Sequence, residues 1–327
     1  MNFVSQMRKA GFEVPTECTL MYDSEPSFDA QALISGLQAL SNGDVVSLDS
    51  DGTAGPNRYL RLSTGGCSIA IEAGNDVRQR AAYFEALDWP MLHRSFEDAE
   101  EVVRAHQAHI HITVETEFDA VANALGVRAM DTSLTRNKLA ANVAAALCRL
   151  DMPTAVHWKP CEMLYRPAPF LRELETNPVA IFVRVTPFSS NKEVAGVRLI
   201  GASTRGAADI LGMEAVLEEA PIPVFPAMDL LQSFVSHCHG RGAYLPHLST
   251  YSPQDGEIVL VRHLESTPEI AEAHVSLEIR QSAEAGYDSS DPNVEDIATP
   301  RTQATWDGGE RRSRPRTAKP FGRRRLT

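Results

Sequence analysis

The chain has 327 residues and a mass of 35.8 kDa, and 43% of its residues are hydrophobic. This is enough for one large or two ordinary domains with a real core. The formal charge of −12 argues against a body that binds nucleic acid, because neutralising phosphates requires a basic face. An aromatic content of 7% also argues against a stacking platform for single strands.

Targeting and redox signals are weak. No window approaches the run of about 18 apolar residues that a membrane span needs, and the N-terminus lacks the apolar segment of a secretory signal. The five cysteines are scattered and never in C-x-x-C spacing, which predicts reduced thiols. We therefore expect a soluble, cytoplasmic protein with no membrane span, no metal site and no cofactor.

Residues 1–92 are expected to form a small α+β unit. Apolar residues at helical spacing predict a helix over residues 30–40, with Ser27 as N-cap and Asn42-Gly43 as its stop. Short alternating runs separated by turn residues then predict strands at 45–49, 58–63 and 67–72.

Residues 93–280 are expected to form the main domain. Helical patterns cover residues 95–106, 132–151, 167–175 and 227–242, the last with a glycine stop. Strand patterns cover residues 109–115, 153–158, 180–188, 197–203, 213–219, 257–266 and 274–280. This order predicts an α+β fold: a mixed β-sheet with helices mainly on one face. Two similar subdomains stay open as an alternative.

Residues 281–327 differ in composition from the rest of the chain. Seven acidic residues and one basic residue occupy 281–310, whereas 311–327 hold eight basic and no acidic residues. The first 310 residues therefore carry −20 and the last 17 carry +8. Because the segment has few aliphatic residues to bury, we expect a disordered tail, acidic and then basic.

Two places in the main domain are candidates for binding a small ligand. A polar turn offers backbone N–H groups and a guanidinium that together can hold an anion; its residues are Ser203, Thr204, Arg205 and Gly206. His109 and His111 share one face of a predicted strand and can act together. The alternative for the turn is that its glycine serves only the backbone conformation between two elements and binds no ligand.

Stronger chemical signatures do not emerge from the sequence. The histidines near residue 106 and the His237-Cys238-His239 run are suited by type to zinc or copper, but the latter two histidines point apart on a helix. The chain contains no G-x-S-x-G and no P-loop sequence. We therefore predict no catalytic and no metal-ligating residue.

The end of the chain contains a candidate linear motif. One aromatic residue stands within a basic run, a pattern suited to docking in a pocket with arginines pairing to acidic groups. The motif residues are Phe321, Gly322, Arg323, Arg324 and Arg325. A membrane surface, nucleic acid, or a purely solubilising role are the alternatives for this tail.

A resemblance covers residues 106–280. The HIHITVE strand, the TRNKLAANVAAAL helix, TAVHW, the FVRV strand and STRGAADILGMEAVLEE occur in this order, and in this the chain resembles a bacterial domain-of-unknown-function family, number 4261. The resemblance implies an α+β domain in a bacterial cytoplasmic protein and brings no activity or site residues with it.

The sequence as a whole favours a non-enzymatic interaction or adaptor module whose C-terminal motif binds a protein partner. One alternative is a small-molecule hydrolase or transferase that uses the Arg205 turn and nearby histidines. Another is a toxin-neutralising or secretion-associated accessory protein, since an acidic surface can cover a basic partner. The oligomeric state does not follow from the sequence.

Overall fold

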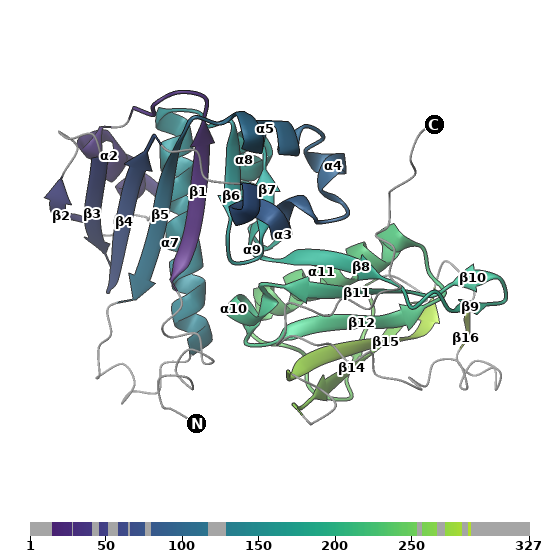
Figure 1. Cartoon of the computed structure of the whole chain (residues 1–327). Coiled ribbons are helices and arrows are strands. Elements are labelled where there is room, and N and C mark those ends of the chain that lie inside the picture. Colours follow the sequence, from purple (N-terminus) through teal and green to yellow (C-terminus); the bar gives the residue numbers. More distant parts are fainter. Residues whose placement is uncertain are drawn as a thin grey trace, which may run out of the picture. The chain divides into compact units, whose positions relative to one another are not determined.

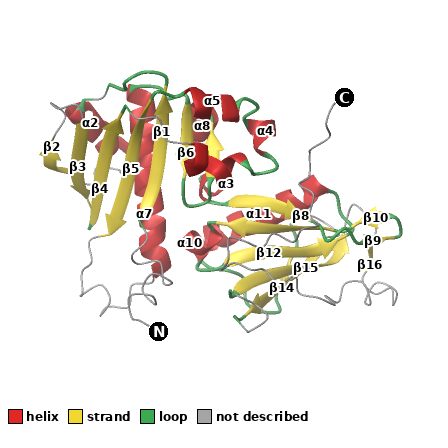
Figure 2. Cartoon of the chain, in the orientation of Figure 1, coloured by secondary structure: helices red, strands yellow, loops and turns green. Residues whose placement is uncertain are grey.

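The computed structural model describes residues 15–27, 29–40, 46–51, 58–64, 66–75, 80–116, 129–253, 257–266, 272–282 and 287–288. The chain divides into two compact units, Met1–Phe182 and Val183–Thr327. Each unit has its own β-sheet with helices packed on it (Figures 1 and 2). The fold is therefore α+β, as the sequence predicted.

The described residues of the first unit build a seven-stranded sheet in the order β2-β3-β4-β5-β1-β6-β7, and every neighbouring pair is antiparallel. The strands are β1 (Thr16–Tyr22), β2 (Ser47–Asp51), β3 (Arg58–Thr64), β4 (Cys67–Gly74), β5 (Ala108–Thr116), β6 (Ala155–Trp158) and β7 (Met163–Tyr165). In β4, buried Ile69 and Ile71 alternate with Ala70 and Glu72, so one face is apolar.

The apolar face of this sheet packs against α2 (Ala30–Leu40) and the long helix α7 (Ala129–Leu150) (Figure 1). Small side chains let the two helices approach closely, since a Cβ on Gly36 would lie 3.6 Å from that of Ala146. The side chain of Asp29 accepts a 2.7 Å hydrogen bond from the N–H of Ala32 and so caps α2. The expected cap, Ser27, instead donates its N–H to Asp151.

Short helices add to the unit. They are η1 (Arg80–Tyr83), α3 (Phe84–Leu87), α4 (Leu92–Ser95), α5 (Ala99–Ala105), α8 (Pro167–Thr176) and α9 (Val179–Phe182). The single helix predicted over 95–106 is interrupted because Phe96 is buried with non-helical backbone angles (φ −149°, ψ 77°). The strand predicted from residue 180 begins later, since Ile181 and Phe182 close a helical turn onto Pro178.

The second unit contains a mixed sheet in the order β13-β14-β15-β12-β11-β8, in which β12 and β15 run parallel. Its strands are β8 (Arg184–Phe188), β11 (Ile200–Arg205), β12 (Glu214–Ala220), β13 (Thr250–Tyr251), β14 (Ile258–Leu264) and β15 (His274–Ser282). The hairpin strands β9 (Glu193–Val194) and β10 (Val197–Arg198) pair with each other. The parallel pair requires the crossover that helix α11 provides.

Helix α11 (Val224–Arg241) covers one face of this sheet. Its buried stripe includes Leu231, Phe234, Val235 and Cys238, the helical spacing that the sequence indicated. Gly242 ends the helix in the left-handed region (φ 72°), which confirms the predicted glycine stop. The five-residue helix α10 (Ala207–Leu211) joins β11 to β12.

The division of the chain differs from the expected one. The sequence placed a boundary after residue 92, but β4 of the first segment pairs along its whole length with β5, beyond that boundary. Register between strands far apart in sequence decides this, and no local pattern encodes it. At the other end, β15 continues to Ser282 and β16 (Tyr287–Asp288) pairs with it. The rest of the predicted tail lies outside the described residues.

Candidate functional site

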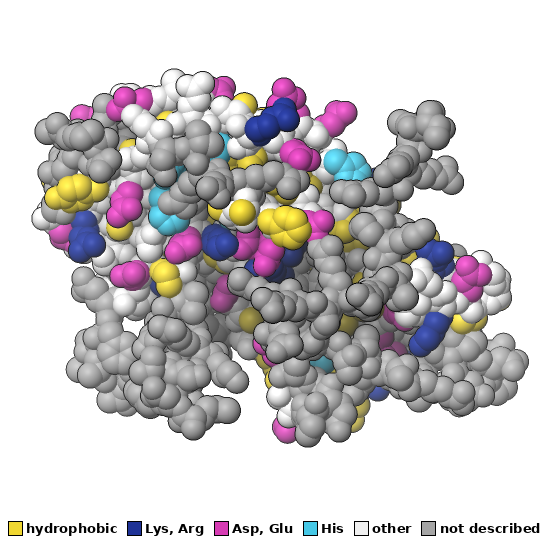
Figure 3. Space-filling model, in the orientation of Figure 1, with side chains coloured by type: hydrophobic (Ala, Val, Ile, Leu, Met, Phe, Trp, Pro, Cys, Tyr) yellow, Lys and Arg dark blue, Asp and Glu magenta, His cyan; other side chains and the backbone are white. Residues whose placement is uncertain are grey.

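The first unit's sheet has a polar face opposite α7, which we call the outer face. Alternation places these side chains on it: Glu17, Thr19, Tyr59, Arg61, Ala70, Glu72, His111, Thr113, Glu115 and His157. In Figure 3, hydrophobic, basic, acidic and histidine side chains lie close together on this unit. The outer face therefore carries most of the candidate chemistry of the first unit.

Part of the outer face is covered. A second apolar cluster joins the sheet strands β1, β6 and β7 to the segment from η1 to α5. Its buried members are Met21, Tyr83, Ala86, Leu92, Phe96, Ala99, Val103, Ala155 and Leu164. Polar residues at the edge of this cluster are buried with it, and they include His157, which is 3% exposed.

His157 is held by a buried carboxylate. Its Nε2 lies 3.0 Å from Oε2 of Glu162, and Oε1 of Glu162 lies 2.6 Å from Nζ of Lys159. The Glu162 side chain is 4% exposed, whereas that of Lys159 is 45% exposed. Burial alone would raise the pKa of Glu162, but the hydrogen bonds with His157 and Lys159 lower this pKa to about 2. Glu162 is thus a fixed negative charge beside an imidazole.

The backbone of Glu162 is unusual as well. Its φ of 54° lies in the left-handed region, which L-residues other than asparagine and aspartate seldom adopt. Such a conformation persists where the surroundings enforce it, and here the two bonds of the carboxylate do so. Neither His157 nor Glu162 was predicted as a site residue from the sequence. The only local signal was a polar residue inside the apolar TAVHW strand.

The histidines singled out from the sequence lie near this pair. His111 Nδ1 is 3.1 Å from the hydroxyl of Thr19, and Thr19 stands opposite both His111 and His157 in the sheet register. His109, on the same face, is 5% exposed. His106 Nδ1 lies 2.6 Å from the carbonyl of Val103. Within the described ranges, no three His, Cys, Asp or Glu side chains are arranged to hold a metal ion.

The predicted anion turn lies in the second unit. Gly206 has the left-handed φ of 96° and begins α10. The carboxylate of Glu214 accepts hydrogen bonds from the N–H groups of Gly206, at 2.8 Å, and Ala207, at 3.2 Å. It also accepts one from the hydroxyl of Thr204 at 2.6 Å. A side chain of the chain itself therefore occupies the place that an anion would take.

The other two turn residues lie in β11 and are paired with neighbouring strands of the sheet. Ser203 stands opposite Thr186 and Val216, and Arg205 stands opposite Arg184. The turn belongs to the second unit, whereas His109 and His111 belong to the first. Ligand binding by either group stays a prediction.

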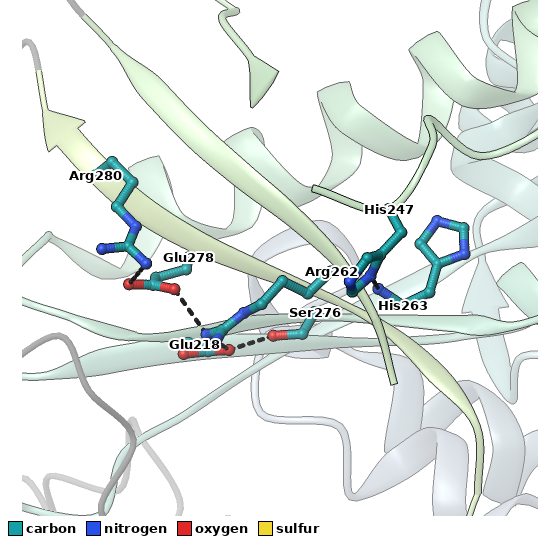
Figure 4. A network of polar contacts seen from close by, with 7 residues as sticks. All are labelled: Glu218, His247, Arg262, His263, Ser276, Glu278 and Arg280. Atoms are coloured by element: carbon teal, nitrogen blue, oxygen red, sulfur yellow. Dashed lines mark hydrogen bonds and ion pairs between the residues drawn. The ribbon is translucent and has the colours of Figure 1, made fainter. Parts of the chain in front are cut away.

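A polar network occupies the face of the second sheet opposite α11 (Figure 4). Arg262 bridges two carboxylates, with 2.7 Å to Glu218 and 2.7 Å to Glu278, and Arg280 lies 2.8 Å from Glu278. Ser276 donates its hydroxyl to Glu218. Burial raises the pKa of Glu278 despite the two guanidinium groups. These charges neutralise one another.

The remaining predicted site residues are in the tail. Phe321, Gly322 and the three arginines that follow lie outside the described residues. All five cysteines are buried, and none of them is in a disulfide. The helices in the described part of the chain include none long and apolar enough to cross a membrane.

Comparison with known proteins gives no further identification. No family model, no curated protein and no solved structure matches the chain. The resemblance of residues 106–280 to the domain-of-unknown-function family therefore stays a prediction.

Proposed function

We propose that the chain is a non-enzymatic interaction module of a bacterial protein and binds a protein partner through the C-terminal motif at residues 321–325. The observation that carries this proposal is that the candidate site groups are paired with other side chains of the same chain. Glu214 fills the predicted anion turn, and Glu162 bonds to His157 and Lys159. Groups that satisfy one another in this way stabilise a scaffold instead of facing a substrate.

The distribution of charge supports a role for the tail. The last 17 residues carry +8, and the 310 residues before them carry −20. Arginine pairs with carboxylates in a bidentate geometry, and one aromatic residue supplies an anchor for a pocket. A partner with an acidic, partly apolar groove would suit this motif.

The experiment is capture of partners from a lysate of the source bacterium by the immobilised full chain. We expect a protein that wild type retains and that F321A and R323A/R324A/R325A lose. The matched control is R311A/R312A/R314A, which removes the same charge from the same tail but leaves the motif intact. Recovery of the same proteins by all four chains would overturn the motif.

A second candidate function is the small-molecule hydrolase or transferase. The His157–Glu162 pair favours it, since a carboxylate that orients an imidazole also serves acid–base catalysis. The Arg205 turn gives this candidate less support because Glu214 occupies its N–H groups. Turnover of simple ester and phosphate ester substrates, abolished in H157Q, would favour it over the interaction module.

The third candidate is a toxin-neutralising or secretion-associated accessory protein. It is favoured by Glu17, Glu72 and Glu115 of the outer face, whose side chains form no ion pair within the described residues. The same capture experiment tests it, because it requires a strongly basic partner that the tail variants still retain.

A further inference from the structure

A loop of the second unit is fastened to strand β14 by two histidines. The loop comprises residues 243–249 and joins α11 to β13. His263 of β14 donates its backbone N–H to Nδ1 of His247 at 2.9 Å, and its Nε2 lies 2.7 Å from the carbonyl oxygen of Leu245. The two imidazole rings, drawn in Figure 4, lie 6.2 Å apart between their centres.

These two contacts define which ring nitrogens carry a proton. A carbonyl oxygen only accepts a hydrogen bond, so Nε2 of His263 is the protonated nitrogen of that ring. A backbone N–H only donates, so Nδ1 of His247 is unprotonated and the ring is neutral while this bond is made. A doubly protonated His247 would point an N–H at the N–H of His263, and the bond would be lost. Neutral His247 is therefore a condition for this contact.

The same part of β14 holds the rest of the loop. The N–H of Leu248 donates to the carbonyl oxygen of Val261 at 2.8 Å, and the N–H of Val261 donates to that of Ser249 at 2.9 Å. Leu248 has a φ of 61° and is 63% exposed, so little packing of its side chain supports the left-handed backbone. Such a conformation persists where the surroundings hold it. The loop therefore depends on its bonds to β14.

We propose that His247 and His263 form a pH-sensitive clasp. The clasp holds residues 245–249 on β14 while His247 is neutral and releases them when His247 takes up a proton. Two positively charged rings at the observed separation would also repel each other. Release frees the N–H and C=O of Val261, which are then open to pairing with a further strand.

The release is local because both ends of the loop are anchored independently of the clasp. At the first end, the hydroxyl of Tyr244 donates to the carbonyl oxygen of Met213 at 2.8 Å, and its ring stacks on Phe234 with 5.9 Å between centres. At the other end, Thr250 pairs with Leu260 in the register of β13 and β14. The second unit should therefore stay folded when the clasp opens.

The elements around the clasp carry other groups that titrate or are charged. They are Tyr244 of the loop, His237, Cys238, His239 and Arg241 of α11, Glu214 of β12, Tyr251 of β13 and Glu265 after β14. His274 of β15 lies on the other face of the sheet, since it stands opposite Leu264 and not His263. Among these side chains, only imidazoles change charge appreciably between pH 7.5 and pH 5.5. The histidines of α11 are therefore the groups that a control must remove.

The experiment is hydrogen exchange of the full chain, measured by mass spectrometry at pH 7.5 and pH 5.5. Each rate is divided by that of an unstructured peptide at the same pH, so that only opening of the structure is compared. An ordinary imidazole has a pKa of about 6.5, so release coupled to its protonation becomes about tenfold more favourable between these two pH values. Peptides that contain residues 245–249 and 261–263 should therefore exchange about tenfold faster at pH 5.5.

The positions of the protons are read separately from ¹⁵N spectra of the histidine rings. At pH 7.5, Nδ1 of His247 should be unprotonated and Nε2 of His263 protonated. These signals report the clasp itself, whereas hydrogen exchange reports the loop that it holds.

Variants of His247 make the result specific. H247N places an amide oxygen close to the position of Nδ1; this oxygen accepts the N–H of His263 and takes up no proton, so the loop should stay protected at both pH values. H247A removes the acceptor and should expose the loop at both. The matched control, H237N/H239N, removes the two imidazoles of α11 and should keep the wild-type response to pH.

A pH response in wild type that H247N abolishes supports the clasp. Equal exchange of the wild-type loop at the two pH values, a response that persists in H247N, or one that the control loses overturns it. A protonated Nδ1 of His247 at pH 7.5, or wild-type protection of the loop in H247A, also overturns it. So does faster exchange throughout the second unit at pH 5.5, because this would indicate general unfolding and not a local release.

Discussion

Replacing Glu162 by glutamine tests the buried His157–Glu162–Lys159 arrangement. The amide has nearly the shape of the carboxyl group, and the left-handed backbone of residue 162 is kept, so the main change is the loss of one negative charge. The pKa of Glu162 is about 2 in the folded chain, against an ordinary value of 4.5. A difference of about 2.5 pH units corresponds to about 3 kcal/mol of stability.

The sign of the pH dependence follows from this lowered pKa. Stabilisation by the carboxylate is complete above pH 4.5 and is lost as the pH falls towards 2. We therefore expect E162Q to be less stable than wild type by about 3 kcal/mol at pH 7, by about half of that difference at pH 3, and by almost nothing at pH 2.

The assay is urea denaturation followed by tryptophan fluorescence. Trp89 and Trp158 both belong to the first unit, and Trp158 is fully buried next to His157. The matched control is Glu175→Gln, which removes an exposed ion pair with Arg149 and should cost less than about 1 kcal/mol. A loss below 1 kcal/mol at pH 7 in E162Q, or a gap that stays constant down to pH 3, would refute the reasoning.

Three further predictions concern other sites. Glu214→Ala leaves the N–H groups at the start of α10 unsatisfied, so we expect a loss of about 1–3 kcal/mol in urea denaturation, with a smaller loss for Glu214→Gln. Gly201→Ala would place a Cβ 2.5 Å from the ring of Phe188, so we expect it to lower the free energy of unfolding by about 1–3 kcal/mol. This loss should become smaller when Phe188→Leu is added, and additive losses in the double variant would contradict the prediction. Burial raises the pKa of the Cys148 thiol to about 12. At pH 8, iodoacetamide should therefore leave this thiol unmodified in the native protein and modify it in the urea-unfolded protein. Rapid modification of Cys148 in the native protein would contradict the prediction.

Local signals determined much of the secondary structure. The Ala-rich pattern ending at Leu150 predicted α7, and the glycine at 242 predicted the end of α11. Alternation predicted that His109 and His111 share one face of β5, and they do. These features depend on neighbours within a few residues, for which the period of a helix or strand is a sufficient guide.

Composition alone showed that acidic residues dominate the first 310 residues and basic residues the last 17. Only the tertiary structure decided which of the charged side chains are paired. Glu214 lies eight residues after Gly206 and looked like an ordinary strand residue, yet the turn of α10 brings its carboxylate onto the N–H groups predicted to bind an anion. Glu17, Glu72 and Glu115 are spread over about a hundred residues of sequence, and only the register of β1, β4 and β5 puts them on the same face of the sheet. Register depends on long-range packing of the opposite, apolar face, which a single sequence does not reveal.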